Sequence, residues 1–140
     1  MRAPAILSLA LLVVLRPALA DNMQPRVILN LQAPRAEIRA ALLRYTPMGS
    51  SIEYVVGFIS KRLEGSGGGP ATIRVEPARI PSLPVVAKTI RVYLGHYYKR
   101  LGTIFLTAPM VVQEDVSASW LFDRSGRLID IVVDTQARVY

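Results

Sequence analysis

The stretch that decides the fold is VSASWLFDRSGRLIDIVV, which runs from Val116 to Val133. Two apolar-rich runs flank the tetrapeptide Asp123-Arg124-Ser125-Gly126, in which the aspartate suits the first position of a type I turn. Gly126 can adopt the positive φ that closes a three-residue loop with a bulge. The stretch therefore predicts a β-hairpin.

The register of this hairpin follows from which side chains must share a face. The apolar side chains are Ala118, Trp120 and Phe122 in the first run and Ile129, Ile131 and Val133 in the second. A plain three-residue loop pairs Phe122 with Leu128, which would place Asp130 beside Trp120. A shift by one residue brings the two apolar faces together instead, because strand side chains alternate with a period of two. We therefore expect a β-bulge between Gly126 and Ile129.

Composition narrows the class of protein. The chain has 140 residues, a formal net charge of +7, one histidine and no cysteine. This length suits one domain, and the basic residues are spread thinly rather than grouped into a tail. The lack of cysteine, together with a single histidine, excludes ordinary zinc, iron–sulfur and thiol chemistry. We expect no cofactor and no nucleic-acid partner.

The first twenty residues have the pattern of a secretory signal peptide. Arg2 supplies the positive start, Ala5 to Leu15 form the apolar core, and Ala18-Leu19-Ala20 is a small-x-small cleavage site. The alternative is an uncleaved anchor, although the apolar run is shorter than the roughly 20 residues of a membrane span. We expect cleavage near Ala20 and a periplasmic or secreted protein without a transmembrane anchor.

Two helices are predicted after an N-terminal arm at 21–32, in which Val27-Ile28-Leu29 is apolar. The first begins around Pro34, with Arg35, Arg39 and Arg44 facing water, and ends before Pro47. Its apolar positions are Ile38, Ala41, Leu42 and Tyr45. The second is capped by Ser50 or Ser51, with Glu53 in its first turn, and ends by Gly65. Its apolar stripe is Ile52, Val55, Val56, Ile59 and Leu63.

A Gly-rich and Pro-rich connection at 64–85 separates the helices from the strands. We expect it to be flexible and irregular, with a short edge strand at Thr72 to Val75. Lys88 to Tyr98 alternates as a strand does, with a bend or bulge at Gly95. β character continues through Thr103 to Leu106, and the strand that enters the hairpin begins near Val111.

The order of elements predicts an α+β fold. Two N-terminal helices would pack on one face of a three- to four-stranded antiparallel sheet, because helices that precede a meander form a two-layer domain with it. The expected organisation is a signal peptide at 1–20, an arm at 21–32, and a single domain at 33–140 that contains the flexible loop 64–85.

Two short motifs give the chain a resemblance to a known family. Gly49, Ser51 and Val55 match a glycine, a helix cap and a valine at fixed spacing, and the hairpin carries Phe122, Asp123, Gly126 and Leu128. This pattern resembles the SmpA/OmlA (BamE) outer-membrane-assembly lipoproteins and the β-lactamase-inhibitor-protein-like domains. The resemblance implies the helix–helix–sheet plan and a protein partner in the envelope. The chain departs from the lipoproteins because it has no cysteine to lipidate.

One basic and aromatic segment is the candidate partner surface. Its members are Tyr93, His96, Tyr97, Tyr98, Lys99 and Arg100. Aromatic rings could stack on a ligand or glycan and the cations could bind an anion, whereas the plainer interpretation is a sheet end with surface tyrosines. As a catalytic base, His96 has no serine or cysteine partner motif.

The acidic residues favour structural roles. Asp123 fits the turn, Asp130 and Asp134 fit an exposed strand face, and Glu114 and Asp115 are expected to be solvated. A hydrolase would need two of these carboxylates facing each other across a cleft. We therefore expect no catalytic residues and no metal site.

The leading hypothesis is an exported, non-enzymatic protein-interaction domain of the cell envelope. The alternative is an inhibitor or immunity-type protein that blocks a secreted enzyme. The partner would be another envelope or secreted protein, and the basic charge leaves an anionic lipid or glycan as a further candidate.

Overall fold

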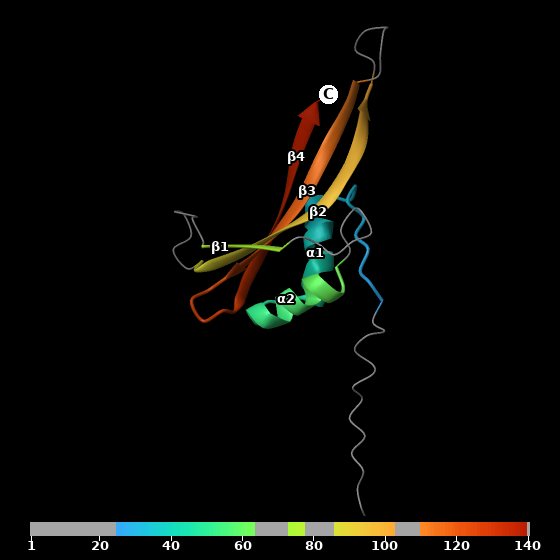
Figure 1. The fold of residues 1–140 in the computed structure, drawn as a ribbon. Helices are drawn as coiled ribbons and strands as arrows, with labels where there is room; N and C mark the ends of the chain where they lie inside the picture. The colour runs from blue at the N-terminus through green and yellow to red at the C-terminus, as the bar shows by residue number, and fades with distance from the viewer. Residues whose placement is uncertain (1–24, 64–72, 78–85, 103–109, 140) are drawn as a thin grey trace, which may run out of the picture.

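The computed structural model describes residues 25–63, 73–77, 86–102 and 110–139. Within them the chain forms two helices and one antiparallel sheet, whose four strands follow each other in chain order (Figure 1). The elements are α1 (Arg35–Tyr45), α2 (Ile52–Lys61), β1 (Ile73–Pro77), β2 (Lys88–Leu101), β3 (Met110–Phe122) and β4 (Leu128–Val139). The α+β class is confirmed. The helices occupy the middle of the chain rather than its N-terminus.

The β3–β4 hairpin has the predicted bulge and, beyond it, the predicted shifted register, whereas Phe122 keeps the plain pairing with Leu128. Trp120 pairs with Ile131 and Phe122 pairs with Leu128, so Ile129 is the extra residue of a bulge. Gly126 has a φ of 76°, and the Asp123 carboxylate accepts hydrogen bonds from the backbone of the residues that follow it in the turn. The turn residues and the need to bury Trp120 therefore set the register together.

A second bulge lies in β2, where the pairing with β3 shifts between Tyr93 and Gly95. Gly95 has a φ of 138°, which confirms the irregularity predicted at this glycine. Because a bulge adds one residue, it exchanges the two faces of the strand beyond it. Leu94 points into the core, and His96 therefore lies on the same face as Tyr93 instead of the opposite one.

The hydrophobic core lies between the helices and one face of the sheet. Ile38 and Leu42 of α1 and Val55 and Ile59 of α2 are buried against the inward side chains of β2, β3 and β4. Trp120 is fully buried, and its indole Nε1 donates to the Thr46 hydroxyl at 3.0 Å. The predicted apolar stripes of both helices therefore cover the sheet. The stripe of α2 is joined by Phe58, which the sequence analysis did not include.

The turn between the helices is hydrogen-bonded to the start of β4. The Gly49 N–H donates to the Leu128 carbonyl at 2.8 Å, and the Leu128 N–H donates to the Ser50 carbonyl at 2.8 Å. Ser51 caps α2 by accepting from the Tyr54 N–H. The two motifs that carry the family resemblance therefore contact each other and join the helical layer to the hairpin.

The N-terminal arm packs on the domain through Val27, which is buried. The Val27 N–H donates to the Arg62 carbonyl at 2.7 Å, at the end of α2. The short edge strand expected near Thr72 is β1, which pairs with β2. The signal-peptide segment 1–20, the glycine run 65–69 and the strand expected at 103–106 lie outside the described residues. None of the helices in the described segments has the length and apolar character that crossing a membrane requires.

Two of the arginines that were predicted to face water also contact the sheet. Arg39, whose side chain is 42% exposed, donates from Nη2 to Asp130 Oδ1 at 2.6 Å and from Nε to the Ile131 carbonyl at 3.0 Å. Arg35 lies 3.7 Å from the Asp134 carboxylate. Both reach β4, an outer strand of the sheet; Arg39 bonds a backbone carbonyl there, whereas Arg35 contacts side chains only. Arg44 is exposed, as predicted.

Candidate binding face

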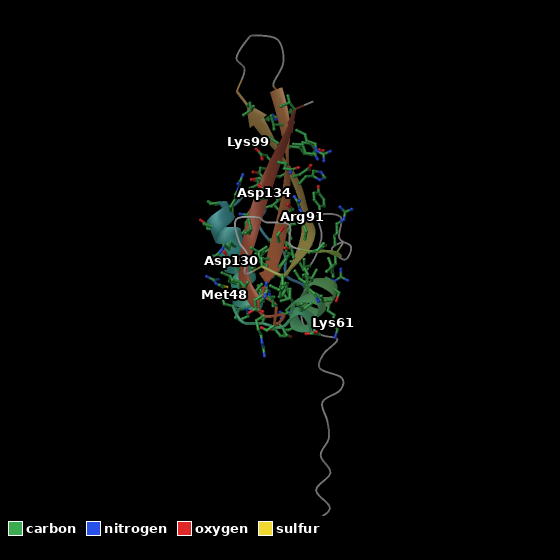
Figure 2. The ribbon with its side chains drawn as sticks, turned by 90° about the vertical axis from the view of Figure 1, so that its left-hand side faces the viewer. Met48, Lys61, Arg91, Lys99, Asp130 and Asp134 are labelled. Carbon is green, nitrogen blue, oxygen red and sulfur yellow. The ribbon has the colours of Figure 1, made fainter. Side chains whose placement is uncertain are left out.

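Among the described residues, both helices cover the same face of the sheet, and no described helix covers the other face (Figure 1). We call this second surface the open face. It carries the outward side chains of the strands, which alternate with the buried ones along β2 and β3. In Figure 2, Arg91 of β2 lies toward one edge of the sheet, and Asp130 and Asp134 of β4 lie toward the other edge, near α1.

A hydrogen-bonded network centred on Asp115 organises the open face. Its Oδ1 accepts from the Gln113 amide at 2.7 Å and from the Tyr93 hydroxyl at 3.2 Å. Its Oδ2 forms an ion pair with Arg138 Nε at 2.8 Å. The Tyr93 hydroxyl also lies 3.1 Å from His96 Nδ1, so donation to Asp115 leaves the Tyr93 oxygen to accept from the imidazole. The network joins side chains from β2, β3 and β4.

This network stabilises the ionised form of Asp115. The hydrogen bond from the Gln113 amide, followed by the charge of Arg138 and the hydrogen bond from Tyr93, holds the pKa of the Asp115 carboxyl below its usual value. Partial burial and the adjacent Asp115 charge raise the pKa of the Tyr93 hydroxyl. At neutral pH Asp115 is therefore an ionised carboxylate that accepts a hydrogen bond from the neutral hydroxyl of Tyr93.

A groove crosses the open face and is lined by side chains from all four strands. Its volume is about 260 Å³, and we call it the arginine groove. It is lined by Arg74, Arg91, Tyr93, Asp115, Ser117, Gln136 and Arg138. Three guanidinium groups face one carboxylate there, so the groove is cationic. Its floor includes Ser117, whose hydroxyl lies 3.4 Å from Arg91 Nη2.

The candidate partner surface is divided between the two faces of the sheet. His96 and Tyr98 pair with Asp115 and Gln113, and Arg100 pairs with Val111, so these three lie with Tyr93 on the open face. The rings of His96 and Tyr98 meet edge to face, with centroids 5.4 Å apart.

Tyr97 and Lys99 lie on the helix side of the sheet. Tyr97 packs against the hydrophobic core, and Lys99 pairs with the buried Val112. Figure 2 places Lys99 toward the end of the sheet that is farthest from Lys61 of α2. The six residues are therefore not one continuous surface, because strand alternation separates neighbours in sequence.

The acidic residues are held apart from one another. Asp123 accepts three hydrogen bonds within the turn; the backbone N–H of Arg127, followed by Ser125, holds its pKa below the usual value. Asp130 and Asp134 contact α1 arginines rather than water alone. Asp115 corrects the expectation of a solvated position, since its side chain is only 12% exposed. Within the described residues, the cationic groove holds a single carboxylate.

Sequence reasoning missed most of the groove. Arg74 of β1 and Gln136 and Arg138 of β4 come from opposite edges of the sheet, and none belongs to a recognisable motif. The available signal was the polar position at every second residue of the hairpin strands. That signal identifies an outward face but does not say which residues of neighbouring strands meet.

Comparisons with known proteins found no matching family model, curated protein or solved structure. Within the described segments, no three His, Asp or Glu side chains come close enough to hold a metal ion. The open face carries three kinds of binding group: guanidinium groups that pair with anions, aromatic rings, and neutral hydrogen-bonding groups.

Proposed function

We propose that the protein is an exported, non-enzymatic interaction domain of the cell envelope that docks a partner protein on the open face. The observation that carries this proposal is the asymmetry of the sheet. One face is used by the helices, and the other presents a groove and exposed tyrosines. Tyrosine and arginine are enriched at protein interfaces, where their large side chains provide much of the contact.

The arrangement of the polar groups favours binding over catalysis. His96 and Asp115 are connected through Tyr93, but no serine, cysteine or lysine nucleophile takes part in the network of described residues. Each hydrogen bond of Asp115 instead braces another outward side chain. A surface whose side chains are held before a partner arrives loses less conformational entropy on binding.

Photo-crosslinking from two matched tyrosines tests where the partner binds. Tyr98 on the open face is 59% exposed, and Tyr54 on α2 is 55% exposed. We expect a photo-crosslinking residue in place of Tyr98 to capture one defined protein in living cells, whereas the same residue in place of Tyr54 does not. Equal capture from both positions, or capture from Tyr54 alone, would contradict the docking face.

Export is proposed from residues 1–20 and has its own test. The protein isolated from cells is expected to begin at Asp21 and to be released with the periplasmic or secreted fraction. Mass spectrometry of the intact protein measures this directly. A chain that retains its first twenty residues and sediments with membranes would favour the uncleaved anchor instead.

The inhibitor or immunity-type role is the second candidate. The braced Tyr93–Asp115–Arg138 arrangement favours it, because inhibitors of enzymes commonly bind through surfaces that change little on association. The identity of the captured protein distinguishes the inhibitor role from the interaction-domain role. A secreted enzyme whose activity falls on addition of this protein identifies an inhibitor, and an envelope component without such activity identifies the interaction domain.

A further inference from the structure

We propose that the arginine groove binds an extended acidic segment of a partner protein, with carboxylates at the Arg74–Arg91 end and at Arg138. This inference rests on the proposed docking role of the open face and adds the chemistry of the docked segment. The positions of the three arginines, the size of the groove and the neutral groups between its ends support it.

The first end of the groove holds two like charges side by side. Arg74 of β1 and Arg91 of β2 are directly opposite each other across the two strands. Their side chains therefore lie on one face of the sheet, within reach of the same ligand. The Arg91 guanidinium contacts the neutral Ser117 hydroxyl. A carboxylate placed between Arg74 and Arg91 could accept hydrogen bonds from both guanidinium groups, because each guanidinium carries five N–H donors.

The other end of the groove is formed by Arg138. Asp115 accepts from its Nε, and this contact fixes the direction of the guanidinium. A guanidinium has five N–H donors, so the Nη groups of Arg138 can still bind a second carboxylate. Gln136 and Ser117 also line the groove, and both can hydrogen-bond to a peptide backbone.

The dimensions favour an extended chain over a compact molecule. The volume of about 260 Å³ lies below the roughly 300–1,000 Å³ of pockets that enclose small molecules. The lining nevertheless comes from four neighbouring strands, so the groove extends across the width of the sheet. A single phosphate would reach one end of it, whereas a peptide with separated acidic residues would reach both.

The test uses a fluorescent octapeptide of alternating glutamate and serine, with the glutamine–serine peptide as its uncharged match. Fluorescence anisotropy measures binding to the full chain at low ionic strength. The variants are Arg91→Gln in the groove and Arg44→Gln on α1, which remove the same charge from opposite sides of the molecule. Both side chains are exposed, and thermal melts verify that both variants fold.

We expect the glutamate peptide to bind and the glutamine peptide not to bind. Arg91→Gln should weaken binding about fivefold, as loss of an exposed ion pair does, and Arg44→Gln should change it less than about twofold. Equal losses in the two variants would mean that net charge alone attracts the peptide, and this would overturn the proposal. Equal binding of the two peptides would overturn it as well.

Vesicles that contain phosphatidylglycerol form a second arm of the test. Binding to vesicles that depends on Arg91, without binding to the glutamate peptide, would identify a membrane surface as the ligand and contradict the acidic segment. Photo-crosslinking from position 98 distinguishes failure of the acidic-segment proposal from failure of the proposed docking function. Capture that persists unchanged in Arg91→Gln leaves the docking face intact and rejects the groove, whereas absence of capture in the wild type rejects the docking face.

Discussion

The two faces of the sheet differ although they are built from alternate residues of the same strands. In β3, Ala118 and Trp120 are fully buried beneath the helices, whereas Ser117 and Ser119 lie on the open face. One face holds the fold together and the other carries the polar network and the groove. The comparison teaches that stability and the proposed binding can be altered separately, by choosing alternate positions along one strand.

The two bulges decide which residue belongs to which face. The bulge at Ile129 allows Trp120 to meet Ile131 instead of Asp130, so the helix side stays apolar. The bulge at Leu94 moves His96 to the face that holds Tyr93. Without one extra residue at each place, polar and apolar side chains would exchange sides beyond it.

The largest expected difference between the faces is measured at two neighbouring residues of β3. Trp120→Ala removes a fully buried ring and should lower the free energy of unfolding by about 3–5 kcal/mol. Ser119→Ala, one residue away on the open face, should change it by less than about 0.5 kcal/mol. Chemical denaturation of both variants measures the contrast. Similar losses would show that the open face also supports the fold.

The buried hydrogen bond between Trp120 and Thr46 provides a smaller test on the helix side. Thr46→Val leaves the buried indole N–H without an acceptor and should cost about 1–3 kcal/mol. The Thr46 hydroxyl also donates to the Leu42 carbonyl, so its loss removes a second bond. Adding Trp120→Phe removes the indole N–H that lacks an acceptor. The double variant should therefore lose less free energy of unfolding than the sum of the two single losses. Denaturation of all four proteins gives the coupling, and strict additivity would contradict the contact.

The difference between the faces also explains what could be predicted from the sequence. The hairpin, its bulge and the apolar stripe of α2 were predictable, because each depends on residues that are close together in the sequence. Burial of Trp120 against Ile131 is a local consequence of alternation near a turn. The side chains on the helix side of the sheet could therefore largely be predicted from the sequence.

The composition of the open face could not be predicted from the sequence in the same way. The groove joins residues of β1, β2, β3 and β4, and its composition depends on the register of each pair of strands. The bulge at Leu94 reverses the alternation of β2, so Tyr93 shares its face with His96 and Tyr98 instead of with Tyr97 and Lys99. The contact between Arg39 and Asp130 spans 91 residues and depends on where α1 crosses β4.

The smallest expected effect concerns the network on the open face and depends on pH. Because the folded protein holds the pKa of Asp115 below its ordinary value of 3.8, the carboxylate contributes stability above that pH. The contribution is lost as the pH falls through the lowered pKa, where the folded protein also takes up the proton. Asp115→Asn cannot ionise, so it should melt below the wild type near neutral pH.

The gap in melting temperature between Asp115→Asn and the wild type should close as the solution is acidified below 3.8. The gap should be smaller than the effect of Thr46→Val, because Arg138 and Tyr93, the partners of Asp115, are exposed to solvent that screens charge. Ser119→Ala is the control, since its difference from the wild type has no reason to follow this titration. A gap that stays constant between neutral and acidic pH would mean that Asp115 acts through packing, and the open face would then share the structural role of the helix side.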